Sequence, residues 1–159
     1  MDIKDTALRY LATRARTSAE MKEHLLQRGY DEKHIEGMID EFKELKYLDD
    51  LQYACDYIHY GISKGRGRIR ISQELFRKGI DSFTAEDAFY RIATEENYQE
   101  GKNQSERDRA LTAARKITDG REIDGTLLGK VSRRLASLGY DNETIYYVLG
   151  ELRKNKKEL

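Results

Sequence analysis

The chain has 159 residues, 38% of them hydrophobic and 36% charged, and its 29 basic side chains balance its 29 acidic ones. The regular spacing of the apolar residues excludes a disordered chain, and a net charge of zero argues against a simple polyanion-binding protein. One cysteine, a charged N-terminus and the lack of any long apolar run indicate a cytoplasmic protein without an internal disulfide, a signal peptide or a membrane span.

Only helical signals recur along the chain. Proline is missing, and so are the alternating β-branched runs and Asn-Gly turns of β-hairpins, so we expect an all-α protein whose helices end at glycines and caps. One ending, Leu-x-x-x-Gly-(Tyr/Ile)-Asp, occurs at residues 25–31, 75–81 and 135–141. This repetition predicts three tandem three-helix repeats that form an elongated, curved body, with bounds at residues 1–48, 49–99 and 104–157.

Each position of the repeated ending has a physical reason. The glycine can adopt the left-handed conformation that ends a helix, while the leucine and the Tyr or Ile form the apolar pair of a Schellman turn. The aspartate then caps the next helix, and the same Tyr or Ile packs on Ile35, Ala85 or Ile145 in that helix. In the second copy, Thr84 with Asp87 offers a competing capping box that would start the helix later.

The first repeat contains a helix break at residues 14–20. Thr17 and Glu20 have the spacing of a capping box, which predicts that a helix restarts there. Arg14 and Arg16 lie beside the break, where they either contact a partner or cap the end of the preceding helix.

The second repeat holds the most distinctive stretch, residues 64–75. Two glycines free the backbone before a helix whose N-terminus attracts anions, so we favour a site for phosphates or for an acidic groove of a partner over a mobile, solvated connector. The basic residues of this predicted surface are Lys64, Arg66, Arg68, Arg70, Arg77 and Lys78. Before the repeat's first helix, Asp49 and Asp50 favour an N-cap role over acid–base or metal chemistry.

Binding, not catalysis, is the function that the remaining residues indicate. Arg133 and Arg134 in the third repeat are surface candidates, either for binding or for solvation. The histidines lack the spacing of zinc ligands, and Cys55 has no adjacent base and is expected in the core. No nucleophile with a base is found, so we expect no enzyme, no metal and no cofactor.

Several of these motifs together resemble those of RecX, the family of bacterial regulators of RecA recombinase. They are Ala-Leu-Arg-Tyr-Leu at 7–11 followed by Arg-x-Arg-Thr at 14–17, Tyr-Leu-Asp-Asp at 47–50, Lys-Gly-x-x-Arg-Ile at 64–69, and Gly-Tyr-Asp at 139–141. The family often has proline after the Lys-Gly, where Arg66-Gly67 stands here, so we expect a looser loop.

The resemblance implies a function. A RecX protein is expected to bind in the groove of the RecA–DNA filament and mostly to inhibit recombinase, ATPase and coprotease activities, within DNA repair, homologous recombination and the SOS response. The basic surface above would make the contact, with Arg14, Arg16, Arg133 and Arg134 as secondary residues. We expect a monomer with a weak affinity for single- or double-stranded DNA. The alternatives are a general DNA-binding helical protein that acts independently of RecA, and a structural adaptor whose basic residues are dispensable.

Overall fold

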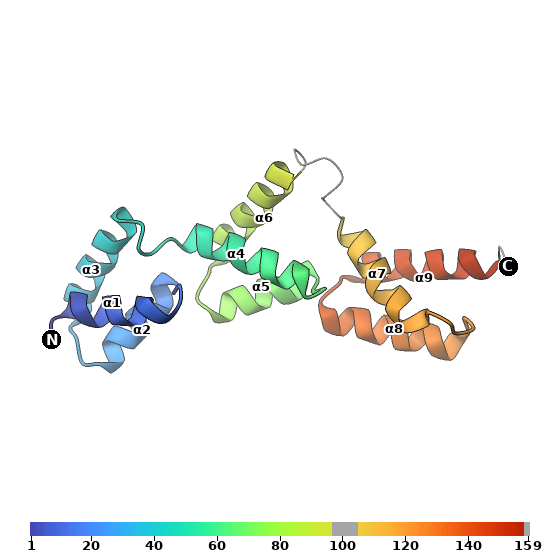
Figure 1. The fold of residues 1–159 in the computed structure, drawn as a ribbon, viewed down its shortest axis with the longest axis horizontal. Helices are drawn as coiled ribbons and strands as arrows, with labels where there is room; N and C mark the ends of the chain where they lie inside the picture. The colour runs from blue at the N-terminus through green and yellow to red at the C-terminus, as the bar shows by residue number, and fades with distance from the viewer. Residues whose placement is uncertain (97–104, 158–159) are drawn as a thin grey trace. The chain divides into compact units, whose positions relative to one another are not determined.

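The computed structural model describes residues 1–96 and 105–157, and within them every regular element is a helix, which confirms the all-α prediction (Figure 1). The described helices are α1 (Ile3–Thr13), α2 (Ser18–Gln27), α3 (Glu32–Glu44), α4 (Asp50–Ser63), α5 (Arg68–Arg77), α6 (Ser82–Glu96), α7 (Glu106–Thr118), α8 (Gly125–Leu138) and α9 (Asn142–Lys157). The predicted repeat bounds at 99 and 104 lie outside the described residues.

Packing divides the chain into two compact units. The first unit consists of Met1–Ile58 with Glu74–Ile92, and the second of His59–Gln73 with Ala93–Leu159. The division falls inside α4, α5 and α6, so each of these helices supplies residues to both units. The division into three repeats stays a prediction.

The repeated helix ending has the same geometry in all three copies. Gly29, Gly79 and Gly139 have φ values of +88°, +89° and +97°. The N–H of the residue after each glycine donates to the carbonyl of the leucine five positions earlier, at 3.2, 3.0 and 3.1 Å. The N–H of the glycine itself donates to the carbonyl of the residue that follows this leucine, at 3.0, 3.0 and 3.1 Å. These paired bonds define a Schellman turn, which confirms the sequence prediction.

The aspartates of the repeated ending cap the helices that follow. Their side chains accept from the backbone N–H groups of Lys33, Thr84 and Thr144, at 3.3, 2.7 and 2.8 Å. Because Asp81 is the cap, α6 begins at Ser82, and the later start suggested by Thr84 is wrong.

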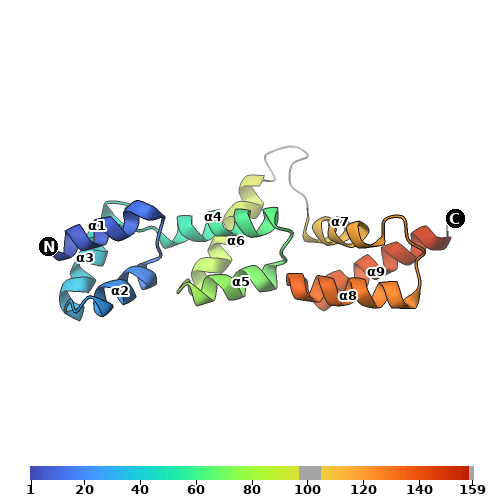
Figure 2. The ribbon, with the colours of Figure 1, turned by 60° about the horizontal axis from the view of Figure 1, so that its bottom comes forward.

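Each unit contains a three-helix bundle with its own core. In the first unit α1, α2 and α3 pack on one another around Met21, Leu25 and Ile35, all fully buried. In the second, α7, α8 and α9 do the same around Val131, Leu135 and Val148 (Figures 1 and 2). Within the described residues, no helix combines the length and the apolar character that a membrane crossing requires.

Candidate functional site

The glycine-rich loop before α5 is docked on the end of α8 within the second unit. The N–H of Gly67 donates to the carbonyl of Leu138 at 2.8 Å, and the N–H of Ile69 donates to the carbonyl of Gly139 at 3.1 Å. The Tyr140 hydroxyl donates to the carbonyl of Gly65 at 2.8 Å. Figure 2 shows the start of α5 beside the end of α8. These bonds hold the loop in place and argue against the mobile connector, the alternative that the sequence left open, while the looser loop expected relative to other family members stays a prediction.

Docking also uses the amide donors at the N-terminus of α5. Besides the N–H groups of Gly67 and Ile69, that of Arg68 donates to a carboxylate oxygen of Glu106 at 2.7 Å. A phosphate would have to displace these partners, so the backbone anion site predicted from the sequence is not available. Any anion binding at this helix end depends on side chains.

Four of the predicted basic residues belong to the second unit. Lys64 and Arg68 are exposed, while Arg66 and Arg70 are half-buried. The Lys64 ammonium and the Arg66 guanidinium lie over the Tyr60 ring, at 5.7 and 5.3 Å from its centroid. These distances are within the range of cation–π attraction, which restricts where the two cations lie.

The other two predicted residues, Arg77 and Lys78, belong to the first unit. Arg77 is exposed. Lys78 is half-buried, with its ammonium 5.2 Å from the centroid of the Tyr57 ring. The six residues of the predicted surface are thus divided between the units, four in one and two in the other.

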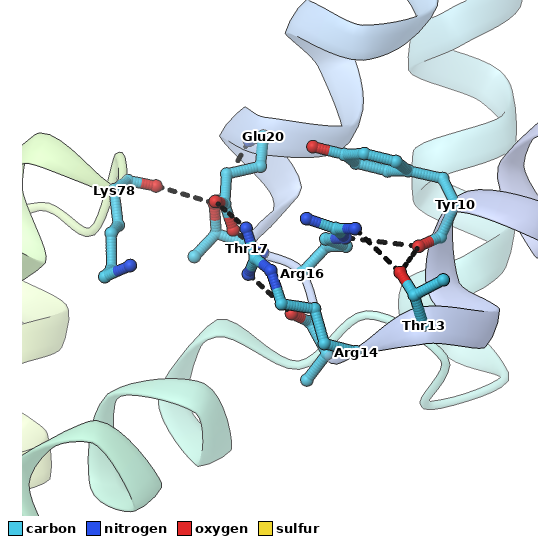
Figure 3. Close-up of polar contacts among 8 residues, drawn as sticks. Tyr10, Thr13, Arg14, Arg16, Thr17, Glu20 and Lys78 are labelled. Carbon is cyan, nitrogen blue, oxygen red and sulfur yellow. Dashed lines mark hydrogen bonds and ion pairs between the residues drawn. The ribbon is translucent and has the colours of Figure 1, made fainter. Parts of the chain in front are cut away.

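The helix break in the first unit is built as the sequence predicts, and it also holds a second helix (Figure 3). The Thr17 hydroxyl accepts from the N–H of Glu20 at 3.1 Å, and the Glu20 carboxylate accepts from the N–H of Thr17 at 3.0 Å. The same hydroxyl donates to the carbonyl of Lys78 at 2.6 Å, beyond the C-terminus of α5. This confirms the capping box and adds a bond that no local pattern predicted.

The arginines beside the break bind to the protein itself. Arg14 pairs with Glu20 at 3.1 Å. The Arg16 guanidinium donates to the carbonyl of Tyr10 at 3.1 Å and to the Thr13 hydroxyl at 2.9 Å, and so caps the end of α1 (Figure 3). The capping alternative for Arg16 therefore holds, and a partner contact by these two residues stays a prediction.

Asp49 and Asp50 have different roles. Asp49 accepts from the N–H of Gln52 at 3.1 Å and caps α4, as predicted. Asp50 instead accepts from the N–H of Ser18 at 2.8 Å, at the start of α2. We expected both aspartates to act at the N-terminus of one helix, but Asp49 caps α4 and Asp50 accepts a hydrogen bond from the start of α2.

Arg133 and Arg134 are both exposed on α8. Arg133 lines a shallow pocket of the second unit together with Arg121 and Lys130. Among the described residues no group of histidine, cysteine and carboxylate side chains is arranged to hold a metal. Cys55 is buried, as predicted for a core residue.

Sequence reasoning missed Arg9 and Arg28. Both line a cavity of about 330 Å³ with Arg16 and His24 in the first unit. A signal was present, because Thr6, Arg9, Tyr10 and Thr13 follow the i, i+3, i+4, i+7 spacing of one helix face. That spacing does not show that the face meets the end of α2.

Comparison with known proteins decides the family. Models of the first and second three-helix domains of RecX match residues 4–42 and 49–88. A regulatory protein RecX of Clostridium perfringens is 31% identical over 157 residues, covering 96% of this chain and 69% of that relative. The chain belongs to the RecX family.

Other RecX proteins extend the comparison. The relative from Vibrio vulnificus is 38% identical over 89 residues, covering 56% of this chain and 58% of that relative. Another relative is matched over 51% of its length, so the chain spans little more than half of these two RecX proteins. The crystal structure of RecX from Lactobacillus salivarius superposes with a TM-score of 0.80 at 23% identity, over 95% of this chain and 94% of that one, and supports the fold.

Proposed function

We propose that this chain binds RecA in the groove of the RecA–DNA filament and mostly inhibits its recombinase, ATPase and coprotease activities. Membership of the RecX family carries the proposal, since its alignments extend over nearly the whole chain. The relatives themselves are named regulatory proteins. The regulated partner is inferred from the resemblance of the sequence motifs.

The second unit supplies the contact surface that we favour, made of Lys64, Arg66, Arg68 and Arg70. Its supporting feature is the docked loop, because cations on an ordered backbone lose less conformational entropy on binding than cations on a mobile one. Arg77 and Lys78 in the first unit are proposed as additional contacts, with Arg14, Arg16, Arg133 and Arg134 as secondary ones.

A protein partner suits the charge of the chain better than bare DNA does. The 29 basic and 29 acidic side chains give no net attraction to a polyanion at long range. A groove lined by both protein and DNA can accept the cations of the docked loop without requiring an overall positive charge.

The test measures ATP hydrolysis by RecA on single-stranded DNA, with and without this protein. We expect inhibition by the intact chain and a loss of most of it in the triple variant Arg66→Ala, Arg68→Ala, Arg70→Ala. The matched control is Arg115→Ala, Lys116→Ala, Arg121→Ala, which removes three exposed cations from the same unit and should inhibit normally.

Two results would contradict the proposal at different levels. Failure of the intact protein to inhibit would exclude RecA regulation of this kind. Equal inhibition by both triple variants would exclude the proposed surface while leaving RecA as the partner. The alternative, DNA binding independent of RecA, predicts tight binding to DNA alone with a steep fall as salt rises.

A further inference from the structure

A cavity of about 330 Å³ opens between α1 and α2 in the first unit. Its α1 wall is the face formed by Thr6, Arg9, Tyr10 and Thr13. Arg16, in the break between the two helices, and His24 and Arg28, at the end of α2, complete the polar lining. No carboxylate is among these lining residues.

One of the three arginines is already held in place. Arg16 lies over the Tyr10 ring, 3.9 Å from its centroid, and donates to the Tyr10 carbonyl and the Thr13 hydroxyl. His24 stacks on the same ring at 3.8 Å with an interplanar angle of 6°. Two groups this close to one ring centre must lie on its opposite faces, so Tyr10 is enclosed between Arg16 and His24.

Within the described part of the chain, the other two arginines have no counter-ion. Among the described residues, neither the Arg9 nor the Arg28 side chain forms an ion pair or a hydrogen bond, whereas Arg14 nearby is paired with Glu20. Burial lowers the pKa of the His24 imidazole, and the positive charges of Arg28 and Arg16 lower it further. The cavity is therefore a region of positive potential with no acid of its own to neutralise it.

We propose that this cavity is a phosphate-binding site in which Arg9, Arg16 and Arg28 hold the phosphoryl oxygens. Guanidinium groups form paired, charge-assisted hydrogen bonds to phosphate, and Arg16 retains N–H groups for this after its two bonds to the protein. Because both faces of Tyr10 are covered, that ring has none left for a base, and recognition depends on the phosphate and not on the base.

The phosphate can belong to a nucleic-acid backbone or to a free nucleotide, and the test separates these sources. Binding of a short fluorescent oligothymidine, a short oligodeoxyadenosine, ATP and inorganic phosphate is measured on the full chain without RecA. The double variant Arg9→Ala, Arg28→Ala is compared with the control Lys33→Ala, Lys43→Ala, which removes two exposed cations from the same unit outside this cavity.

We expect the Arg9→Ala, Arg28→Ala variant to weaken binding about tenfold and the control to leave it unchanged. For an oligonucleotide, the salt slope should fall by about 1 to 2, equally for both base sequences. Loss confined to the oligonucleotides identifies a nucleic-acid backbone as the source, and loss that includes ATP or inorganic phosphate identifies a free phosphate. Binding should also shift the imidazole resonances of His24 in NMR spectra, which locates the ligand.

Either of two outcomes overturns this site. The first is that the intact chain binds none of the four ligands. The second is that the Arg9→Ala, Arg28→Ala variant binds all of them as well as the control does. Since RecA is absent from the assay, neither outcome bears on the RecA proposal.

Discussion

Glycines with similar backbone angles have very different surroundings in this chain. A Cβ at Gly29 would meet no atom within 4 Å, whereas a Cβ at Gly139 would overlap the backbone of Arg70. Gly67 has the complementary role, because its Cβ would overlap the backbone of Gly139. The helix-ending glycine of α8 thus serves both as a turn residue and as the place where another backbone approaches.

Alanine substitutions separate these two roles. Gly29→Ala should cost about 1 kcal/mol, the strain of a left-handed alanine. Gly139→Ala should cost several times more, because the overlap with Arg70 is added to the same strain. Gly67→Ala measures the cost of an overlap with the Gly139 backbone alone, because Gly67 does not have a left-handed backbone conformation. Urea unfolding followed by circular dichroism gives the three free energies, and equal costs for Gly29→Ala and Gly139→Ala would contradict the close docking.

A pH dependence follows from Glu20. Burial raises the pKa of its carboxyl, but the Thr17 amide and the Arg14 guanidinium outweigh burial, and the net pKa is below the ordinary value of 4.5. The folded chain then holds this proton more weakly than the unfolded one. Its contribution to stability is full above the unfolded pKa and is lost as pH falls through the folded one.

Glu20→Gln checks this contribution. At neutral pH the wild type should be more stable than the variant in urea unfolding, and this advantage should shrink as the pH is lowered below about 4.5. An advantage that stays constant across this pH range would mean that the charge of Glu20 does not stabilise the break.

At the scale of the elements, most helix ends are capped by hydrogen bonds to residues a few positions away in the sequence. Two helix ends, the start of α2 and the end of α5, are instead bonded to the same side chain. The fully buried Thr17 hydroxyl caps the start of α2 and also donates to the Lys78 carbonyl beyond α5. Asp50 supports the same start of α2 from the first turn of α4. Within the first unit, hydrogen bonds at these helix ends therefore connect helices that are distant in the sequence.

Removal of this hydroxyl should affect both helices. Thr17→Ala should cost about 2 to 4 kcal/mol, from a lost N-cap and a carbonyl left without its partner. Thr17→Ser keeps the hydroxyl and should cost much less. The measurement is the free energy of unfolding in urea, and a loss for Thr17→Ser as large as for Thr17→Ala would show that the methyl group, not the hydroxyl, matters.

At the scale of the whole molecule, the two compact units are linked by shared helices. Because α4, α5 and α6 each supply residues to both units, neither unit can unfold without shortening a helix that the other uses. We therefore expect both to unfold in one cooperative transition.

Cys55 reports on this coupling. It is 5% exposed and lies in the first unit, while Leu135 is fully buried in the core of the second. Leu135→Ala should destabilise the chain by about 2 to 5 kcal/mol and should also speed the reaction of the Cys55 thiol with a labelling reagent. Leu26→Ala, at a position 44% exposed, is the control. Destabilisation without faster labelling of Cys55 would show that the units unfold separately.

The sequence by itself determined the helical class, the three Schellman turns, the aspartate caps and the Thr17–Glu20 capping box. These features are bonds between residues at most five positions apart, so residue type and spacing are sufficient to predict them. The family motifs could likewise be recognised without a structure, and the comparisons confirm the family that these motifs indicated.

Only the tertiary structure decided what the local patterns left open. It showed that the amides at the N-terminus of α5 are bonded to the end of α8 and to Glu106, and that Arg16 caps α1. It also brought Arg9 and Arg28 to one cavity. Each of these depends on which helix faces meet, and that is set by the summed packing of distant apolar side chains. The charge of a residue can be read from the sequence, but whether that charge is already neutralised depends on this packing.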